Sequence, residues 1–267
     1  MSYALSTHQA LWSPRPSADG LPTYSYALVD KGQMRPCPAA MTRWLAGVAH
    51  TSLFEGCFAE AALDLSPVLI SLSSDTQTAQ SAIERLDKHC GELPIVSVID
   101  TTLTLHALTR HLQSLLRIEA DGAQYLLRLA DTQMLEAALS SLTREQHAAF
   151  FAGIGHWWIV DYGQRCRDVA PSERSAEPAS LPLVLSAEQT AQLIDAAELP
   201  IAVSQMRAYD SSFGRLSHVE RTRFMHECRD LLTPDEAATD TGLLSVAIRR
   251  WQLQSRVQDE AQTEDLP

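Results

Sequence analysis

The sequence predicts an α/β protein: a lobe built on a mixed β-sheet, followed by a small lobe made of helices. Over residues 23–163, short apolar runs rich in β-branched residues alternate with segments whose apolar residues recur every three or four positions. This alternation is typical of strands separated by helices. Residues 164–182 are polar, contain prolines and lack periodicity, so we expect a linker. Residues 183–256 carry helix-start signals without strand-like runs and form the predicted helical lobe.

The two ends of the chain differ in composition from the rest. Residues 1–22 are rich in Pro and Ser and are predicted to be a loosely packed N-terminal extension. They lack the basic and apolar regions of a signal peptide. Residues 257–267 hold four acidic and no basic residues, so we expect a disordered acidic tail.

Composition limits the classes of function. The 267-residue chain has a net charge of −12, which argues against binding to nucleic acid or to an anionic membrane, because both need a basic surface. No apolar run approaches the roughly 20 residues that span a bilayer. The five cysteines are scattered and form no CxxC pair, which is typical of reduced thiols. We therefore expect a cytoplasmic protein.

The first half of the α/β lobe has clear element signals. A strand over 24–29 ends at the turn residues Asp30-Lys31-Gly32, and a helix is expected over 39–50. Residues 52–56 form a loop, and a strand over 65–72 has Pro67 near its start, where a missing donor is tolerated. Ser73 or Ser74 is the predicted cap of the next helix. The apolar positions expected to be buried in that helix are Ala79, Ile83, Leu86 and Cys90.

The stretch over residues 93–131 is the predicted centre of the lobe. A buried strand over 93–99 precedes a helix capped by Asp100 or Thr101, whose leucines recur at helical spacing. Asp121-Gly122 predicts a tight hairpin turn before a return strand over 125–129, because both residue types tolerate positive φ.

The later elements begin with two further capping signals. A helix is expected over 132–142, and Thr143 with Gln146 forms a capping box for the next. The last strand is predicted over 157–162. In the helical lobe Ser186 and Gln189 form another capping box for a helix that Pro200 should end. Helices are then expected over 201–210, 216–232 and 234–255, the last capped by Thr233.

Most signatures of active sites are absent from the sequence. It contains no GxSxG, no GxxxxGK[ST] and no GxGxxG after a strand, so neither a nucleophile elbow nor a phosphate loop is predicted. His106 and His111 are five residues apart and do not share a helical face. For His89-Cys90, an activated thiolate is the less favoured interpretation, because adjacent residues point to different faces. For His226-Glu227-Cys228, contiguous ligands on a helix diverge. We expect no metal, no cofactor and no enzymatic activity.

Two carboxylates keep an alternative open. Asp100 and Asp131 both follow predicted strands, a position where catalytic groups often lie and where helix caps also lie, and capping is the favoured interpretation. Arg128 is either an anion clamp or, as we prefer, a partner for a carboxylate. Trp157 and Trp158 are expected to be one core ring and one surface ring. The alternative function is an α/β enzyme or a small-molecule-binding protein with a site near Asp100 and Asp131.

A cluster of arginines stands out in the acidic helical lobe. Arg207, Arg215, Arg221, Arg223 and Arg229 fall within 23 residues, interleaved with three aromatic residues. Arginine and aromatic residues are enriched in protein interfaces, although a solvated helix face has the same composition. The interface interpretation predicts six binding residues: Arg207, Tyr209, Phe213, Arg215, Arg221 and Arg223.

An ordered series of motifs resembles the adaptor-chaperone family of type VI secretion effectors. The series is Tyr-Ala-Leu-Val-Asp at 26–30, Ser-Leu-Phe-Glu-Gly at 52–56, a 101–117 helix with the ending His-Leu-Gln-Ser-Leu-Leu-Arg-Ile, Asp-Gly at 121–122, Leu-Arg-Leu-Ala-Asp at 127–131, and Ala-Ala-Phe-Phe-Ala-Gly-Ile before a tryptophan. The predicted structural residues of these motifs are Asp30, Glu55, Gly56, Arg128 and Asp131. Where the family tends to read Arg-Phe-Tyr-Asp-Pro, this chain has Arg128-Leu129-Ala130-Asp131-Thr132.

The resemblance implies a loader without enzymatic activity. Such a protein would bind a toxic effector in the cytoplasm of the producing cell, stabilise it and help to mount it on the VgrG/PAAR spike proteins. The partners expected from the resemblance are therefore the cognate toxin and the spike, with neither nucleic acid nor membrane.

Overall fold

A computed structural model describes residues 23–34, 37, 39–90, 93–160, 166–171, 180–239 and 241–264, with side chains described as far as residue 254. The predicted N-terminal extension, residues 164–165 and 172–179 of the predicted linker, and residues 265–267 lie outside this described part. The chain divides into two compact units, Met1–Leu193 and Ile194–Pro267. Strands lie in the first unit and helices dominate the second, which confirms the predicted α/β class with a helical C-terminal part.

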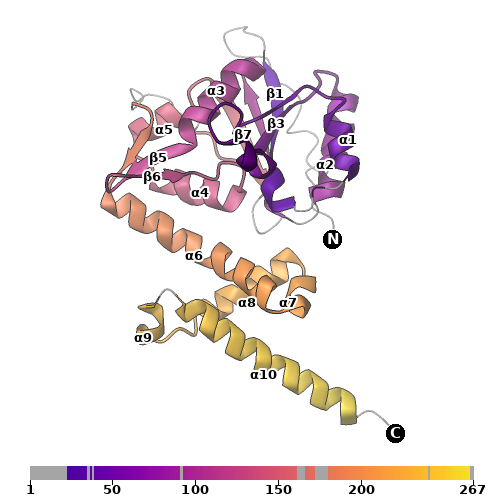
Figure 1. The fold of residues 1–267 in the computed structure, drawn as a ribbon, viewed down its shortest axis with the longest axis vertical. Helices are drawn as coiled ribbons and strands as arrows, with labels where there is room; N and C mark the ends of the chain where they lie inside the picture. The colour runs from indigo at the N-terminus through magenta and orange to yellow at the C-terminus, as the bar shows by residue number, and fades with distance from the viewer. Residues whose placement is uncertain are drawn as a thin grey trace. The chain divides into compact units, whose positions relative to one another are not determined.

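The first unit is organised around a six-stranded antiparallel sheet with the order β2-β3-β1-β4-β7-β8 (Figure 1). Its strands are β1 (Tyr24–Asp30), β2 (His50–Ser52), β3 (Pro67–Ser71), β4 (Val96–Thr101), β7 (Ile154–Val160) and β8 (Cys166–Asp168). The predicted strands therefore exist with shifted ends. Tyr162 of the predicted last strand lies outside the described residues.

Helices cover both faces of this sheet, as the continuous burial of β1 from Ser25 to Asp30 requires, because successive side chains of a strand point to opposite faces. Ala27 and Val29 pack under α1 (Ala39–Leu45) and α2 (Thr76–Cys90), and all four residues predicted to be buried in α2 are buried. Tyr26 and Leu28 face the other core. That core includes α3 (Leu105–Leu115), α4 (Thr132–Ser141) and α5 (Arg144–Phe150), which lie on the opposite side of the sheet in Figure 1.

A second, three-stranded sheet has the order β6-β5-β9. The hairpin of β5 (Arg117–Ala120) and β6 (Ala123–Leu126) turns at Asp121 and Gly122, whose φ angles are 52° and 73°, as the sequence predicted. The return strand ends earlier than expected. β9 (Leu183–Leu185) pairs in parallel with β5, so the strands of the first unit are mixed in direction.

Two strands lie in stretches where the sequence predicts no strand: one in the predicted linker and one at the start of the predicted helical lobe. Residues 166–168 of the predicted linker form β8, which pairs with β7. Residues 183–185, expected in the helical lobe, form β9 and bury Leu183 and Leu185 in the core of the first unit. Both strands have three residues, so neither shows a detectable period, and each is stabilised by a partner distant in sequence.

The second unit is helical in its described residues. α6 (Ala187–Tyr209) begins in the first unit and continues into the second. It is followed by α7 (Ser211–Arg215), α8 (His218–Arg229), α9 (Pro234–Ala237) and α10 (Gly242–Glu264). The core of this unit gathers apolar side chains of α6, α7, α8 and α10, including Met206, Phe213 and Met225.

Several predicted helix ends are wrong. Pro200 does not end α6, because Leu199 and Val203 on either side of it are held in the apolar core. The helix predicted over 234–255 is divided into α9 and α10. α10 continues to Glu264, so the predicted disordered tail is helical as far as that residue. In the first unit Asp75, rather than Ser73 or Ser74, accepts the amide of Thr78 at the start of α2.

Two short 3₁₀ helices complete the first unit: η2 (Lys31–Met34) after β1, and η3 (Glu60–Leu65) before β3. Among the described residues, no helix is long and apolar enough to cross a membrane.

Candidate functional site

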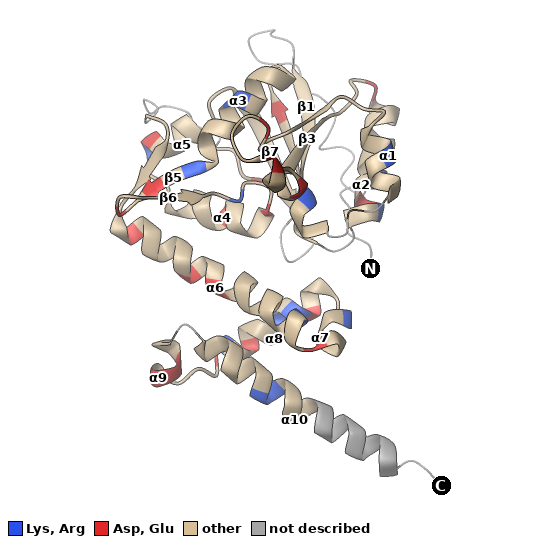
Figure 2. Ribbon diagram, in the orientation of Figure 1, with Lys and Arg blue, Asp and Glu red and all other residues tan. Residues whose placement is uncertain are grey.

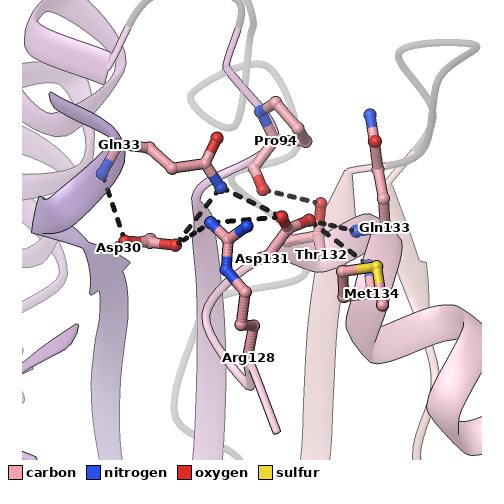
Figure 3. Close-up of polar contacts among 8 residues, drawn as sticks. All are labelled: Asp30, Gln33, Pro94, Arg128, Asp131, Thr132, Gln133 and Met134. Atoms are coloured by element: carbon pink, nitrogen blue, oxygen red, sulfur yellow. Dashed lines mark hydrogen bonds and ion pairs between the residues drawn. The ribbon is translucent and has the colours of Figure 1, made fainter. Parts of the chain in front are cut away.

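Asp30, Arg128 and Asp131, three of the five predicted structural residues, meet in one polar cluster (Figure 3). Asp30 is the last residue of β1, and its side chain is 8% exposed. Its Oδ1 accepts the amide of Gln33, and its Oδ2 accepts Arg128 Nη2 at 3.0 Å and Gln33 Nε2 at 3.2 Å. The end of the strand is thereby fixed to the turn that follows it and to a segment far along the chain.

Asp131 is the N-cap of α4, as predicted. Its Oδ1 accepts the amides of Gln133 and Met134 at 3.1 and 3.3 Å, which satisfies two free donors of the first turn. Its Oδ2 accepts Gln33 Nε2 at 3.0 Å and lies 3.5 Å from Arg128 Nη2. Gln33 therefore bridges the two carboxylates, a contact that its sequence position does not indicate.

The charges of the cluster do not balance. Two carboxylates with side chains 8% and 5% exposed share one guanidinium whose side chain is 48% exposed. Burial raises the pKa of Asp131, and the charges of Arg128 and Asp30 act on it in opposite directions. Arg128 is thus the predicted partner of a carboxylate, and half of its side chain remains in contact with solvent.

Thr132 stands where the resembling family tends to have proline. It is the first residue of α4, and both its amide and its hydroxyl donate to the carbonyl of Pro94, at 2.9 and 3.2 Å. A proline could make neither bond, because it lacks the N–H and the hydroxyl. The departure from the family motif therefore adds a connection between α4 and the segment that precedes β4.

Glu55 and Gly56 lie away from this cluster, in the turn after β2. Gln113 Nε2 of α3 donates to the carbonyls of Leu53 and Glu55, at 3.3 and 2.9 Å. Gly56 has a φ of 75°, a conformation that side chains disfavour. The five predicted structural residues thus belong to two separate places in the first unit.

Asp100 does not cap a helix, because Thr104 caps α3. Asp100 instead belongs to a polar row that crosses four neighbouring strands. Ser25 donates to Asp100 at 2.5 Å, Asp100 pairs with His156 on β7, and His156 Nδ1 lies 2.6 Å from Asp168 Oδ2 on β8. Burial raises the pKa of Asp100, whereas the hydrogen bonds from Ser25 and Trp158 oppose that rise. The sequence does not reveal this row, because strand pairing creates it.

The geometry separates the two carboxylates of the alternative site. Asp100 lies near the end of β4, whereas Asp131 is beside Pro94, which precedes the start of β4. Five strand residues at about 3.3 Å each place them on the order of 16 Å apart. One reaction centre containing both is therefore not formed.

The histidine and cysteine candidates lack the environment of a reactive site. Burial raises the pKa of Cys90 to about 12 and that of Cys228 to about 11, the opposite of thiolate activation. His111 Nε2 is 2.8 Å from the carbonyl of Phe150. In the described part of the chain, no three His, Cys, Asp or Glu residues are grouped to hold a metal.

Trp157 and Trp158 are both buried, at 0% and 7% exposure, so the expected surface ring is wrong. Successive residues of β7 point to opposite faces, and helices cover both faces. Trp157 lies in the core shared with α3 to α5, and Trp158 lies in the core under α1 and α2.

The predicted binding residues of the second unit fall into two groups. Phe213 is 0% exposed and packs among Phe224 and Trp251, and Arg221 is 7% exposed and donates to the carbonyls of Gly214 and Leu216. The prediction that Phe213 and Arg221 lie on a binding surface is therefore wrong, because both side chains are in the interior of the unit. The other four are exposed: Arg207, Tyr209, Arg215 and Arg223. Figure 2 shows basic segments on α7, α8 and α10 beside acidic ones.

Residues 25–149 match the family model described as a domain of unknown function, DUF4123. The matched stretch runs from β1 into α5 and includes Asp30, Glu55, Gly56, Arg128 and Asp131. No match is found among the curated proteins or among the solved structures.

Proposed function

We propose that this chain is a cytoplasmic adaptor that binds a type VI secretion toxin, stabilises it and helps to load it onto the VgrG/PAAR spike. The observation that carries the proposal is the match of residues 25–149 to the DUF4123 model. All but the end of the motif series that resembles the adaptor-chaperone family lies in the same stretch. The motif series and the family model therefore cover the same part of the chain.

The polar cluster gives the proposed adaptor a firm scaffold. Asp30, Gln33, Arg128 and Asp131 connect the end of β1 to the start of α4, and the two carboxylates of this group are buried. A binding protein needs elements of fixed geometry on which a contact surface is presented. In a loader, these residues are expected to contribute stability rather than chemistry.

The exposed residues of the second unit are the proposed contact with the toxin. Arg207, Arg215 and Arg223 are exposed, and Tyr209 is 51% exposed. Arginine donates two parallel bonds to a carboxylate, and tyrosine contributes contact area at a low cost in entropy. An acidic, partly apolar segment of the toxin fits this composition.

Co-expression with a toxin from a neighbouring gene, where the proposal expects one, tests the proposal. We expect the toxin to be soluble with the chain and to be insoluble or degraded without it. Replacing Arg207, Tyr209, Arg215 and Arg223 together by Ala should weaken co-purification at least tenfold.

A matched control replaces exposed residues of similar type in the first unit: Arg43, Lys88, Arg110 and Tyr125, the last 50% exposed. Equal loss in both quadruple variants would reject the placement of the contact. A toxin that is equally soluble and equally exported without this chain would reject the adaptor function itself.

A further inference from the structure

A pocket of about 890 Å³ opens beside β2, the edge strand of the six-stranded sheet. It is bounded by residues of η2, α1, the turn after β2 and η3. The lining that matters for recognition consists of the β2 residues and three charged side chains: His50, Thr51, Ser52, Lys31, Glu55 and Asp64.

The pocket reaches the free edge of β2, the side on which no described strand pairs with it. His50 pairs with Ile70 and Ser52 with Val68, so their side chains lie on the face covered by α1 and α2. Thr51 pairs with Leu69 and lies on the opposite face. One pocket that touches all three residues therefore extends around the edge of the strand, since the other edge of β2 is bonded to β3.

The backbone of β2 offers hydrogen-bonding groups at this edge. The amide of Ser71 donates to the carbonyl of Ala49, and the amide of Leu53 donates to the carbonyl of Pro67. In an antiparallel pair, alternate residues bond to the neighbouring strand, so Ala49, Thr51 and Leu53 are directed to β3. The N–H and C=O groups of His50 and Ser52 are consequently directed toward the free edge.

The charged residues of the pocket favour a basic occupant. Glu55 and Asp64 are both exposed, and Lys31 is the one cation among the described lining residues, so the formal charges of these residues sum to a negative value in a chain that is itself acidic. The carbonyl of Glu55 is held by Gln113 of α3, so the loop that carries this carboxylate is fixed in place.

We propose that this pocket docks an extended segment of a partner polypeptide, which adds a strand to β2 and directs a Lys or Arg side chain toward Glu55 and Asp64. Main-chain bonds at a sheet edge supply affinity, and side-chain pockets supply specificity, in the known mode of β-strand addition. This proposal does not depend on the adaptor role. The proposed toxin contact is in the second unit, whereas this pocket is in the first unit and would select any extended segment with the right side chains.

The test selects a phage library of random nonapeptides on the full-length chain. The enriched peptides should contain at least one Lys or Arg flanked by β-prone residues. Synthetic copies should bind at least tenfold more weakly to the double variant Glu55→Lys, Asp64→Lys. His50→Pro, which removes an edge donor but no bond to β3, should weaken binding to a similar extent.

Glu60→Lys is the matched control, because Glu60 is exposed on η3, carries the same charge and does not line the pocket. Enriched peptides without basic residues, or peptides that bind all variants equally, would overturn the proposal. A failure to enrich any peptide would also overturn it. The proposal would also be overturned if the chain formed a concentration-dependent dimer that the Glu55→Lys substitution dissociates. That result would place a second copy of the chain at this edge.

Discussion

Arg128 Nη2 lies 3.0 Å from Asp30 Oδ2, although 98 positions separate the two residues in the chain. The contact joins the loop before α4 to the end of β1. Because Asp131 also accepts from Gln33, the segment around Arg128 is fixed at two points. The stability of the first unit should therefore depend on this cluster more than on other surface arginines.

Arg128→Met should destabilise the first unit by about 1–2 kcal/mol, because two buried carboxylates lose their cation while the aliphatic stem is kept. The half-exposed position of Arg128 keeps the loss below that of a fully buried pair. Hydrogen exchange of the β1 and β4 amides measures the effect. Arg110→Met, at an exposed position on α3, is the control and should change stability by less than about 0.5 kcal/mol.

Asp131→Asn should become less destabilising as pH rises from below 4 toward neutrality. The folded-state pKa of Asp131 is raised above its ordinary value of 3.8, so the folded state binds the proton more tightly than the unfolded state. The wild type therefore loses stability as pH rises through this window, whereas the Asn variant retains the cap without the titration. Urea unfolding of both proteins at several pH values checks the sign. A difference that is constant with pH would contradict the raised pKa.

Ser25→Ala should destabilise the first unit more at pH 7 than at pH 4. Ser25 donates at 2.5 Å to Asp100, both residues are 5% exposed, and this bond lowers the pKa of the carboxyl that burial raises. Removing the donor leaves a buried carboxylate short of a partner at neutral pH, at a cost of about 1–3 kcal/mol. Combining Ser25→Ala with Asp100→Asn should abolish most of the pH dependence. An additive double variant would show that the two residues do not interact.

Arg221→Met should destabilise the second unit by about 1–3 kcal/mol, whereas Arg223→Met should change its stability by less than about 0.5 kcal/mol. Arg221 is 7% exposed and donates to two carbonyls that precede α8, while Arg223, two residues later, is exposed. Thermal unfolding followed at Trp251, which packs against Phe213 and Phe224, measures both. Equal effects would indicate that Arg221 does not stabilise the interior of this unit.

Signals contained in a few neighbouring residues predicted much of the local structure. The capping boxes at Thr143 and Ser186, the helix cap at Thr233 and the Asp121-Gly122 turn are all present, because each depends on side chains within four residues of one another. Asp131 as a helix cap belongs to the same group.

Contacts between distant segments could not be predicted in this way. β8 and β9 have three residues each and exist through pairing with β7 and β5. The bridge that Gln33 makes between Asp30 and Asp131, and the row from Ser25 to Asp168, likewise depend on which strands become neighbours. Pro200 predicts the end of a helix, but burial of the apolar residues around it outweighs this local preference.

The parallel pairing of β9 with β5 has a practical consequence for anyone who divides this protein. A fragment ending between 164 and 182, where the sequence suggests a natural break, would lose Leu183 and Leu185 and leave Ile118 and the outer edge of β5 open to water. Such a fragment is expected to aggregate. A cut just beyond Leu193 leaves the hairpin with its third strand and keeps the first turns of α6.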